Sequence, residues 1–483
     1  MSYDITVIGS GMGSLTAAAL LANRGLKVQI IEQNWLPGGC TSSYWRKGFI
    51  FESGATTLVG MDKGMPLRYL LDEIKLDIPM RKLMLPMQVH LKNGETINKY
   101  HDIEKWIGEA NRHFGGEQAE FWRKAYKLSK FVWSASTKYQ TFPPRKTADF
   151  FGLLSNFSPA DIPGALQAFQ STEKVMNRHH VRSDDFDAYV DEQLLITAQN
   201  HKDEVNFLFG SASLCYTNYG NYYVDGGLIN LVTPLVRYIE SKGGRILYRN
   251  PVEEIAHDRK NGYRIKTKKG EFTSRYLISG IPVNNTLQIY PEAQKQIKAT
   301  KILPSKKLNS AFQMGIGFKT HREYESLHHQ IHLANPLPET GSKSIFLSLS
   351  HPEDISRSDK DGYTVASVST HIPDPEKKII DPKKAEAAVV QILTKHDFLK
   401  PENIAYHHSS SPKSWMKWTG REWGFVGGYP QFIKVKPWEM IEARIDDYGA
   451  YQVGDTAYPG QGIPGTSLGG IVAARKMIND WNL

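Results

Sequence analysis

Near the N-terminus, short apolar runs and a small-residue helix follow one another in the order typical of a strand–helix–strand unit. Residues 4–8, DITVI, predict a short buried strand, and LTAAALLANRG predicts a helix closed by Gly25. Residues 27–31, KVQII, predict a second strand, which ends at Glu32. This order predicts a βαβ unit in which the glycines of residues 9–13 form the turn that enters the helix.

Elsewhere the hydrophobic pattern predicts strands in two blocks and helices between them. The stretches MQVHLKNG, SAFQMGIGF, SIFLSLS and GYTVASVSTHI predict a mixed sheet from residues 80–105 and 290–435. Residues 105–220 carry long apolar faces and predict helices, while residues 222–256 predict a turn, a helix and a strand. Near the C-terminus, GAYQVGD predicts a strand, and a helix over residues 465–479 follows it.

Composition narrows the class of protein. A chain of 483 residues is too long to fold around one ordinary hydrophobic core, so two or three domains are expected. Its 40% hydrophobic and 23% charged residues are ordinary for a globular protein. The net charge of +9 suits nucleic acid, an anionic lipid or an acidic substrate, with basic residues scattered over a solvated surface as the alternative. The sequence has no RNA-binding signature or zinc-finger spacing, so nucleic-acid binding is not expected. Two cysteines, Cys40 and Cys215, offer no disulfide framework and predict a reducing, cytoplasmic location. No apolar run reaches the length of a transmembrane helix.

Two glycine-rich stretches compete for the role of a dinucleotide-binding turn. GQGIPG, residues 460–465, fits the pattern G-x-G-x-x-G, whereas GSGMGS, residues 9–14, has Ser14 at the last position. Context favours the N-terminal stretch, because Glu32 follows 23 residues after Gly9, where an acid accepts hydrogen bonds from a ribose. Ser14 is small enough for the close helix–strand packing that the third glycine provides. The C-terminal stretch is interpreted as a turn that enters a helix, with a proline in the first helical turn.

A third motif resembles that of a known family. PGGCTSSYWRKGFIFESGATTLVG places a double glycine, Gly48, Glu52 and Gly54 in a regular series. It resembles the second fingerprint of the flavin-dependent amine oxidase and carotenoid desaturase superfamily. The C-terminal VGDTAYPGQGIPGTSLGGIVAARK resembles the closing Gly-Asp motif of that superfamily. The resemblance implies an α/β fold with FAD as the cofactor: a Rossmann-like FAD-binding domain of the glutathione-reductase type, a mixed-sheet substrate domain and a helical lid or membrane-facing region.

The resemblance also implies which residues contact FAD. The turn into the first helix binds the pyrophosphate, Glu32 the ribose, the backbone of Val252 the adenine, and Asp455 the ribityl or pyrophosphate part. The N-terminus of the closing helix has the positive potential that suits a reduced flavin. The cofactor-binding residues implied in this way are Gly9, Ser10, Gly11, Gly13, Ser14, Glu32, Gln33, Gly38, Gly39, Cys40, Thr41, Gly54, Ala55, Thr56, Val252, Gly454, Asp455, Gly462, Ile463 and Pro464.

Shorter motifs resemble one branch of the superfamily. PGGC, FPPR and GGYPQF look like the carotenoid isomerase and C-3′,4′ desaturase branch. They look most like the C-3′,4′ desaturases of monocyclic carotenoids of the γ-carotene or 1′-hydroxy type. Phytoene desaturases carry Arg where Cys40 stands, which counts against that assignment. The resemblance implies an enzyme in which a hydride leaves a carbon allylic to the polyene for flavin N5, with oxygen or a quinone as the final electron acceptor.

Four other functions share the implied fold and stay open. A carotenoid cis–trans isomerase uses reduced FAD without net redox change, and a saturase runs the reaction in the reducing direction. A non-enzymatic prenyl or lipid escort protein, such as a Rab GDP-dissociation inhibitor, is expected to have a degraded flavin site. Gly9, Gly11, Glu32, Gly54 and Asp455 argue against that reading. A flavin amine oxidase needs an aromatic cage and a polar entrance, which the sequence does not locate.

Motifs for FAD at both ends and in the middle of the chain predict a discontinuous FAD-binding domain. The intervening segments must then form the substrate half of the protein. The predicted domains are residues 1–75, 220–290 and 440–483 for FAD, 80–105 and 290–435 for the substrate sheet, and 105–220 for the helical lid.

Residues 142–170 combine apolar and basic side chains in a way that suits a bilayer interface. An ordinary helical lid packed on the core is the alternative. Because a carotenoid is insoluble and about as long as a bilayer is thick, ~30 Å, we expect a membrane-facing entrance and peripheral membrane association. The side chains concerned are Phe142, Phe150, Phe151, Leu153, Leu154 and Phe157, with Arg145 and Lys146.

The sequence identifies no catalytic residue. Cys40 is expected to pack against the cofactor, with a flavin linkage or a redox thiol as alternatives. Histidine pairs occur at residues 179–180, 328–329 and 407–408, without the cysteine or carboxylate spacing of a metal site, so no metal is expected. The candidates to line the substrate site, with a packed aromatic core as the alternative, are Trp423, Phe425, Tyr429 and Phe432.

Overall fold

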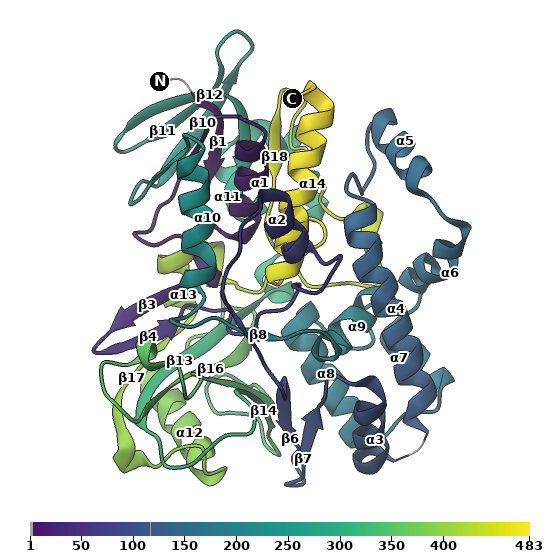
Figure 1. Cartoon of the computed structure of the whole chain (residues 1–483), viewed down its shortest axis with the longest axis vertical. Coiled ribbons are helices and arrows are strands. Elements are labelled where there is room, and N and C mark those ends of the chain that lie inside the picture. The colour runs from purple at the N-terminus through teal and green to yellow at the C-terminus, as the bar shows by residue number, and fades with distance from the viewer. Residues whose placement is uncertain (1–2, 116) are drawn as a thin grey trace.

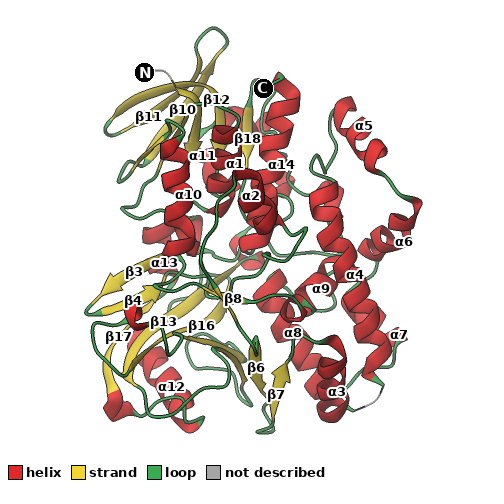
Figure 2. Ribbon diagram, viewed as in Figure 1, coloured by secondary structure: helices red, strands yellow, loops and turns green. Residues whose placement is uncertain are grey.

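Two sheets of seven strands each organise the computed structural model, which describes residues 3–115 and 117–483 (Figure 1, Figure 2). The first sheet runs in the order β10-β11-β12-β1-β2-β9, and β18 lies beside β12. Because β1 pairs in parallel with both β2 and β12, the carboxyl ends of these strands meet at one edge. The strands are β1 (Tyr3–Ile8), β2 (Val28–Ile31), β9 (Arg245–Leu247), β10 (Val252–Asp258), β11 (Gly262–Thr267), β12 (Gly270–Ser279) and β18 (Ala450–Gln452).

Four helices build the hydrophobic core against this sheet. They are α1 (Met12–Asn23), α2 (Pro66–Ile74), α10 (Ile229–Ser241) and α14 (Ile463–Trp481). α1 consists largely of small and aliphatic residues, and every residue from Met12 to Ala22 is buried. α1 lies against α14, so the two ends of the chain are side by side (Figure 1). The predicted βαβ unit and the predicted closing helix are confirmed.

The second sheet runs in the order β17-β13-β16-β15-β14-β6-β7. On β13, Phe312, Met314 and Ile316 pack with helix α12, whereas Gly315 and Gly317 face the hairpin of β3 and β4. A Cβ at Gly317 would lie 2.6 Å from the Phe49 ring, so the missing side chain lets the hairpin rest on the sheet. The elements are β3 (Ser43–Arg46), β4 (Phe49–Glu52), β6 (Met87–His90), β7 (Thr96–Lys99), β13 (Asn309–Lys319), β14 (His328–His332), β15 (Ser344–Leu349), β16 (Tyr363–Pro373), β17 (Ile404–Ser410) and α12 (Pro382–Lys395).

A helical region stands beside both sheets. Its aromatic core surrounds the side-chain nitrogen of Lys99, which lies 3.6 Å from the ring centroid of Trp106. Of the helices in the described residues, none combines the length and the apolar run needed to cross a membrane. The helices of this region are α3 (Ile103–Phe114), α4 (Gln118–Lys138), α5 (Thr147–Asn156), α6 (Ile162–Ala165), α7 (Thr172–Arg178), α8 (Asp184–Ala198) and α9 (Phe207–Leu214).

The strands divide among the segments that carry the sequence motifs. All strands of the first sheet come from residues 1–75, 220–290 and 440–483, and all strands of the second come from 80–105 and 290–435. Four further short elements complete this description. They are β5 (Arg81–Lys82), which pairs with β8 (Tyr222–Tyr223), and helices α11 (Val283–Ile289) and α13 (Pro412–Thr419).

Candidate functional site

The turn between β1 and α1 leaves space beside the helix N-terminus. Gly9 has φ +81°, which a side chain would strain, and its N–H donates to the carbonyl of Ile31 at the end of β2. Gly11 is the N-cap residue of α1, and among the described residues no side chain caps this helix. An added Cβ at Gly11 would meet nothing within 4 Å in the described structure. The helix N-terminus is therefore open to a ligand of negative charge.

The next two residues are used for close packing. A Cβ at Gly13 would lie 3.0 Å from the N atom of Gly454 and 3.1 Å from the carbonyl oxygen of Thr466. Gly13 therefore lets the two ends of the chain meet. Ser14 stands where the pattern has its third glycine, and its Oγ fills the space that a Cβ at Gly280 would occupy. Gly280, just beyond β12, is thus the small residue that accommodates the serine, a compensation that local sequence reading did not find.

Glu32 lies at the end of β2 and is fixed by hydrogen bonds. Its Oε2 accepts from the N–H of Ser10 at 2.9 Å and from the Ser10 hydroxyl at 2.6 Å, and its Oε1 accepts from the N–H of Asn34 at 2.8 Å. The amide side chains of Gln33 and Asn34 donate to the carbonyl of Trp418, in α13. The acid is therefore held beside the turn, as the βαβ motif requires.

Val252, the residue expected beside an adenine, begins β10 close to this acid. The preceding turn is bonded to the end of β2, since the N–H of Asn250 donates to the carbonyl of Glu32 at 2.9 Å and that of Arg249 to the carbonyl of Asn34 at 2.9 Å. These bonds hold the start of β10, and with it Val252, close to Glu32, although β10 and β2 are not adjacent in the sheet.

The double-glycine motif folds onto the same turn. Gly38 and Gly39 both have positive φ, and the N–H of Gly38 donates to the carbonyl of Ser10 at 2.9 Å. The short helix Gly39–Thr41 follows, and the N–H of Ala55 donates to the carbonyl of Cys40 at 2.8 Å. These bonds bring residues 38–41 and 54–55 to the N-terminus of α1.

Two contacts tie this motif to the second sheet. The Thr56 hydroxyl accepts from the Ser348 hydroxyl at 2.8 Å, and Ser348 also bonds Nδ1 of His328 at 2.9 Å. The carboxylate of Glu52 pairs with Arg357 at 3.0 Å, and both side chains are buried. Glu52 is thereby a structural residue that joins the hairpin to the short helix Ile355–Arg357, between β15 and β16.

An arginine that sequence reading missed completes the closing motif. Arg421 donates to both carboxylate oxygens of Asp455, at 3.2 Å and 2.8 Å, and both side chains are largely buried. Burial raises the pKa of the nearby Cys40 thiol, and the positive charge of Arg421 offsets this only in part. Cys40 is therefore a protonated thiol at neutral pH, which favours packing over a reactive thiolate. Arg421 opens the segment REWGF, so its charge beside the aromatic residues was the available signal.

The C-terminal glycine stretch forms the turn and first residues of α14. Gly462 is the N-cap residue with φ +82°, and Pro464 stands in the first turn. A Cβ at Gly470 would lie 2.5 Å from the carbonyl oxygen of Gly13. The glycines of this stretch serve the turn and the contact between α14 and α1, as the interpretation of a turn entering a helix predicted.

Of the four aromatic residues expected to line a substrate site, Phe425 needs a correction. Phe425 is completely buried and Tyr429 nearly so, in a core cluster with Ile8 and Leu277 of the first sheet. A side chain enclosed by protein offers no surface to a substrate, so Phe425 belongs to the packed aromatic core named as the alternative. The Tyr429 hydroxyl donates to the side-chain oxygen of Asn284.

The other two aromatic residues are half-buried. Trp423 packs at the edge of the same cluster, and the Nζ of Lys307 lies 5.5 Å from the ring centroid of Phe432. The segment does reach the site, because the N–H of Tyr429 donates to the carbonyl of Asp455 at 3.1 Å.

The histidine pairs do not gather into a site. His328 and His329 are buried in β14, and burial lowers the pKa of His328 to about 4, so the imidazole is neutral. Within residues 3–115 and 117–483, no group of three or more metal-binding side chains occurs.

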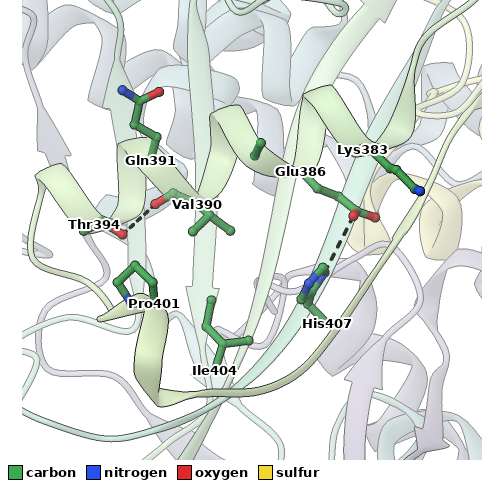
Figure 3. A pocket seen from close by; sticks show the side chains of 9 residues that line it. Lys383, Glu386, Val390, Gln391, Thr394, Pro401, Ile404 and His407 are labelled. Carbon is green, nitrogen blue, oxygen red and sulfur yellow. Dashed lines mark hydrogen bonds and ion pairs between the residues drawn. The ribbon is translucent and has the colours of Figure 1, made fainter.

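A hollow of about 560 Å³ lies elsewhere, between α12 and β17 (Figure 3). Its lining includes Glu386 and His407, whose side chains lie 3.7 Å apart at one side of the hollow. None of the residues predicted to bind FAD lines this hollow.

The residues gathered around α1 fit a flavin dinucleotide. The helix N-terminus beside Gly11 is open where a pyrophosphate would bind, Glu32 retains acceptor capacity for a ribose, and Cys40 lies near Arg421 and Asp455. These positions are far apart in sequence, and the parallel strands and α14 bring them together.

Comparisons with known proteins agree with this assignment. A model of the family described as flavin containing amine oxidoreductase matches residues 15–478. Prolycopene isomerase 1, chloroplastic, of an Oncidium hybrid cultivar is 24% identical, and the alignment covers 99% of this chain and 84% of that protein. The all-trans-retinol 13,14-reductase of Homo sapiens is 27% identical over 53% of this chain and 42% of its own length. The solved structure of cyclohexylamine oxidase from Brevibacterium oxydans has a TM-score of 0.62 at 14% identity, covering 99% of this chain and 98% of that one.

The family match begins within α1, at residue 15, and ends in α14, at residue 478, so it includes the double-glycine and closing motifs, while the turn of residues 9–14 lies just before it. The structural likeness supports the fold, an FAD-binding α/β domain joined to a mixed sheet. The protein is an enzyme, and FAD is its cofactor. The chain belongs to the family of flavin containing amine oxidoreductases.

Proposed function

We propose that this FAD enzyme acts on a carotenoid and that its reaction is cis–trans isomerisation of the polyene. The observation that supports this is the alignment with prolycopene isomerases over nearly the whole chain, 99% for the Oncidium protein and 100% for that of Arabidopsis thaliana. The similarity to a retinol reductase, another protein whose name refers to an isoprenoid polyene, points to the same substrate class.

The residues of this chain fit an apolar substrate. Bound FAD supplies the hydride-exchanging group. The charges near it are paired within the protein, because Arg421 neutralises Asp455, and Cys40 contributes a neutral thiol. A lining without net charge avoids the desolvation cost that an apolar polyene would otherwise impose on unpaired ions.

A second candidate is C-3′,4′ desaturation of a monocyclic carotenoid of the γ-carotene or 1′-hydroxy type. The observation that favours it is the sequence of the double-glycine motif, PGGC, together with FPPR. In that reaction the substrate loses a hydride to the flavin and a proton to a base, and oxygen or a quinone reoxidises the flavin. Peripheral membrane association and a cytoplasmic location complete the proposal.

The test uses FAD-loaded protein and carotenoid-containing liposomes under anaerobic conditions. With the flavin reduced in advance and a poly-cis carotenoid supplied, isomerisation changes the isomer profile on chromatography while the flavin stays reduced. With oxidised flavin and a γ-carotene-type substrate, desaturation bleaches the flavin and shifts the polyene absorption to longer wavelength. If neither arm alters its carotenoid, the proposed substrate class is wrong.

The control for both arms is the Gly11→Ala variant stripped of FAD and assayed without added FAD, since the fold accommodates this substitution. Isomer change that persists in this variant comes from light or heat and does not count.

A further inference from the structure

Helix α5 is apolar, yet within the described structure it buries none of its large apolar side chains. Asp149 is the buried residue of this helix. The exposed fraction is 52% for Phe150, 67% for Phe151 and 67% for Leu154, and Phe157 just beyond the helix is 51% exposed. A helix this short is marginal in water without tertiary support. Something other than apolar packing must hold it in place.

A buried ionic network supplies that support. Arg444 donates to both carboxylate oxygens of Asp149, at 2.7 Å and 2.9 Å, and to Asp480 of α14 at 2.5 Å and 2.9 Å. The Asp149 carboxylate also accepts from the N–H groups of Arg145 and Lys146. Burial alone would raise the pKa of Asp149, but these donors leave it below its usual value, so the carboxylate is ionised. The first turn of α5 is thus fixed to the FAD-binding half, and its apolar side chains are left outside.

The apolar surface continues beyond α5. Phe169, in the short helix Leu166–Phe169, lies with its ring centroid 5.5 Å from that of Trp438. α5 and α6 line one edge of the molecule, outside α4 (Figure 1). The exposed apolar side chains of this surface, named here the α5 face, are Phe150, Phe151, Leu154, Phe157, Ile162, Leu166, Phe169 and Trp438. They are half of the large hydrophobic side chains exposed in the described residues, a concentration that marks an interaction surface.

Basic side chains border the α5 face. Arg145 and Lys146 precede α5, and both are exposed. The Nζ of Lys436 lies 5.2 Å from the ring centroid of Phe169. Lys301 donates to the carbonyl of Glu439 at 2.6 Å, next to Trp438. Apolar side chains with a basic rim are the composition of surfaces that insert into the headgroup layer of an anionic membrane.

We infer that the α5 face docks into the interface of a bilayer that contains anionic lipid, with the Asp149–Arg444 pair holding the helix at the surface. The charge of the rim favours this occupant over a second copy of the chain, because self-association through this face would bring like charges together. The inference rests on exposure and charge, and it stands whether or not the substrate is a carotenoid.

The test is co-sedimentation of the full-length, FAD-loaded protein with vesicles of phosphatidylcholine and with vesicles that also contain phosphatidylglycerol. The variant Phe150→Ser/Phe151→Ser removes apolar side chains that make no core contact. Ile379→Ser is the matched control, because Ile379 is 93% exposed and lies outside the α5 face. Flavin content and thermal unfolding establish that each variant is folded.

We expect the parent and Ile379→Ser to bind the anionic vesicles, and Phe150→Ser/Phe151→Ser to partition at least about tenfold less. Binding of the parent should weaken with added salt and on phosphatidylcholine alone. Failure of the parent to bind anionic vesicles overturns the inference, and so does equal binding of the parent and the double variant. A dimer that the double variant abolishes, in a protein that ignores vesicles, assigns the face to a second copy instead.

Discussion

Gly11 and Gly13 offer a sharp test of the cofactor site, because alanine should affect them in opposite ways. At Gly11, φ is −65° and ψ 168°, a conformation open to alanine, and an added Cβ meets nothing within 4 Å of the described residues. Gly11→Ala should gain about 0.4–1 kcal/mol of stability because alanine restricts the unfolded chain more than glycine does. It should lose a similar amount because alanine is a poorer N-cap residue. The free energy of unfolding of the FAD-free protein should therefore change by less than about 1 kcal/mol.

At Gly13 the same methyl group has no room. Its Cβ would lie 3.0 Å and 3.1 Å from backbone atoms of Gly454 and Thr466, which cannot rotate away as a side chain can. Overpacking of this kind costs about 1–3 kcal/mol, and the better helix propensity of alanine returns about 1 kcal/mol. Gly13→Ala should therefore destabilise the FAD-free protein by up to about 2 kcal/mol.

For FAD affinity the larger effect should come from Gly11→Ala, the variant whose stability changes little. The methyl group of Gly11→Ala stands where the pyrophosphate is expected, and a clash of about 1–3 kcal/mol weakens binding about five- to 150-fold. Urea unfolding of FAD-free protein, followed by circular dichroism, gives the stabilities. Titration with FAD, followed by flavin fluorescence, gives the dissociation constants. If Gly11→Ala binds FAD within about twofold of the parent, the pyrophosphate does not lie at this turn.

Three further predictions concern the same site and the helical core. Gly280→Ala should destabilise the protein by about 1–3 kcal/mol, because the added methyl group overlaps the Ser14 hydroxyl. Adding Ser14→Gly should recover most of this loss. If the changes in the free energy of unfolding are additive in this double-mutant cycle, the two residues do not pack against each other as described. Glu32→Ala should lower the flavin content of the purified protein more than Glu32→Gln does, because glutamine keeps an acceptor oxygen. The ratio of flavin absorbance to protein absorbance measures this content. Unchanged content in both variants would argue against the ribose contact. Lys99 is fully buried, and desolvation lowers its pKa from 10.5 to about 7. Between pH 7 and pH 10 the side chain is therefore protonated in the unfolded chain but mostly neutral in the folded protein. The free energy of unfolding of the parent should rise with pH over this range. Lys99→Met should raise the free energy of unfolding by on the order of 3–5 kcal/mol near neutral pH and by less at pH 10, because it removes the cost of the lowered pKa. Equal gains in the free energy of unfolding at both pH values would refute the lowered pKa.

The local sequence predicted the helices and strands of the FAD-binding half, because the patterns that specify these elements span only a few residues. The apolar run before Gly9, the alanine-rich helix and the strand ending at Glu32 each formed where expected. The same holds for the closing helix, where Pro464 in the first turn marks the start. Aromatic residues were harder to assign, because a run such as REWGFVGGYPQF suits a packed core and a substrate wall equally. Burial decided this for Phe425.

What the sequence determined by itself was the series of strands, helices and glycine turns, together with the family that those turns resemble. These follow from backbone conformation and from the periodicity of apolar residues, which act over a few positions. Tertiary structure alone decided the pairings between distant residues: Ser14 with Gly280, Arg421 with Asp455, and Asp149 with Arg444. No local pattern encodes these pairs, because each depends on which surfaces come together when the two sheets and the closing helix pack.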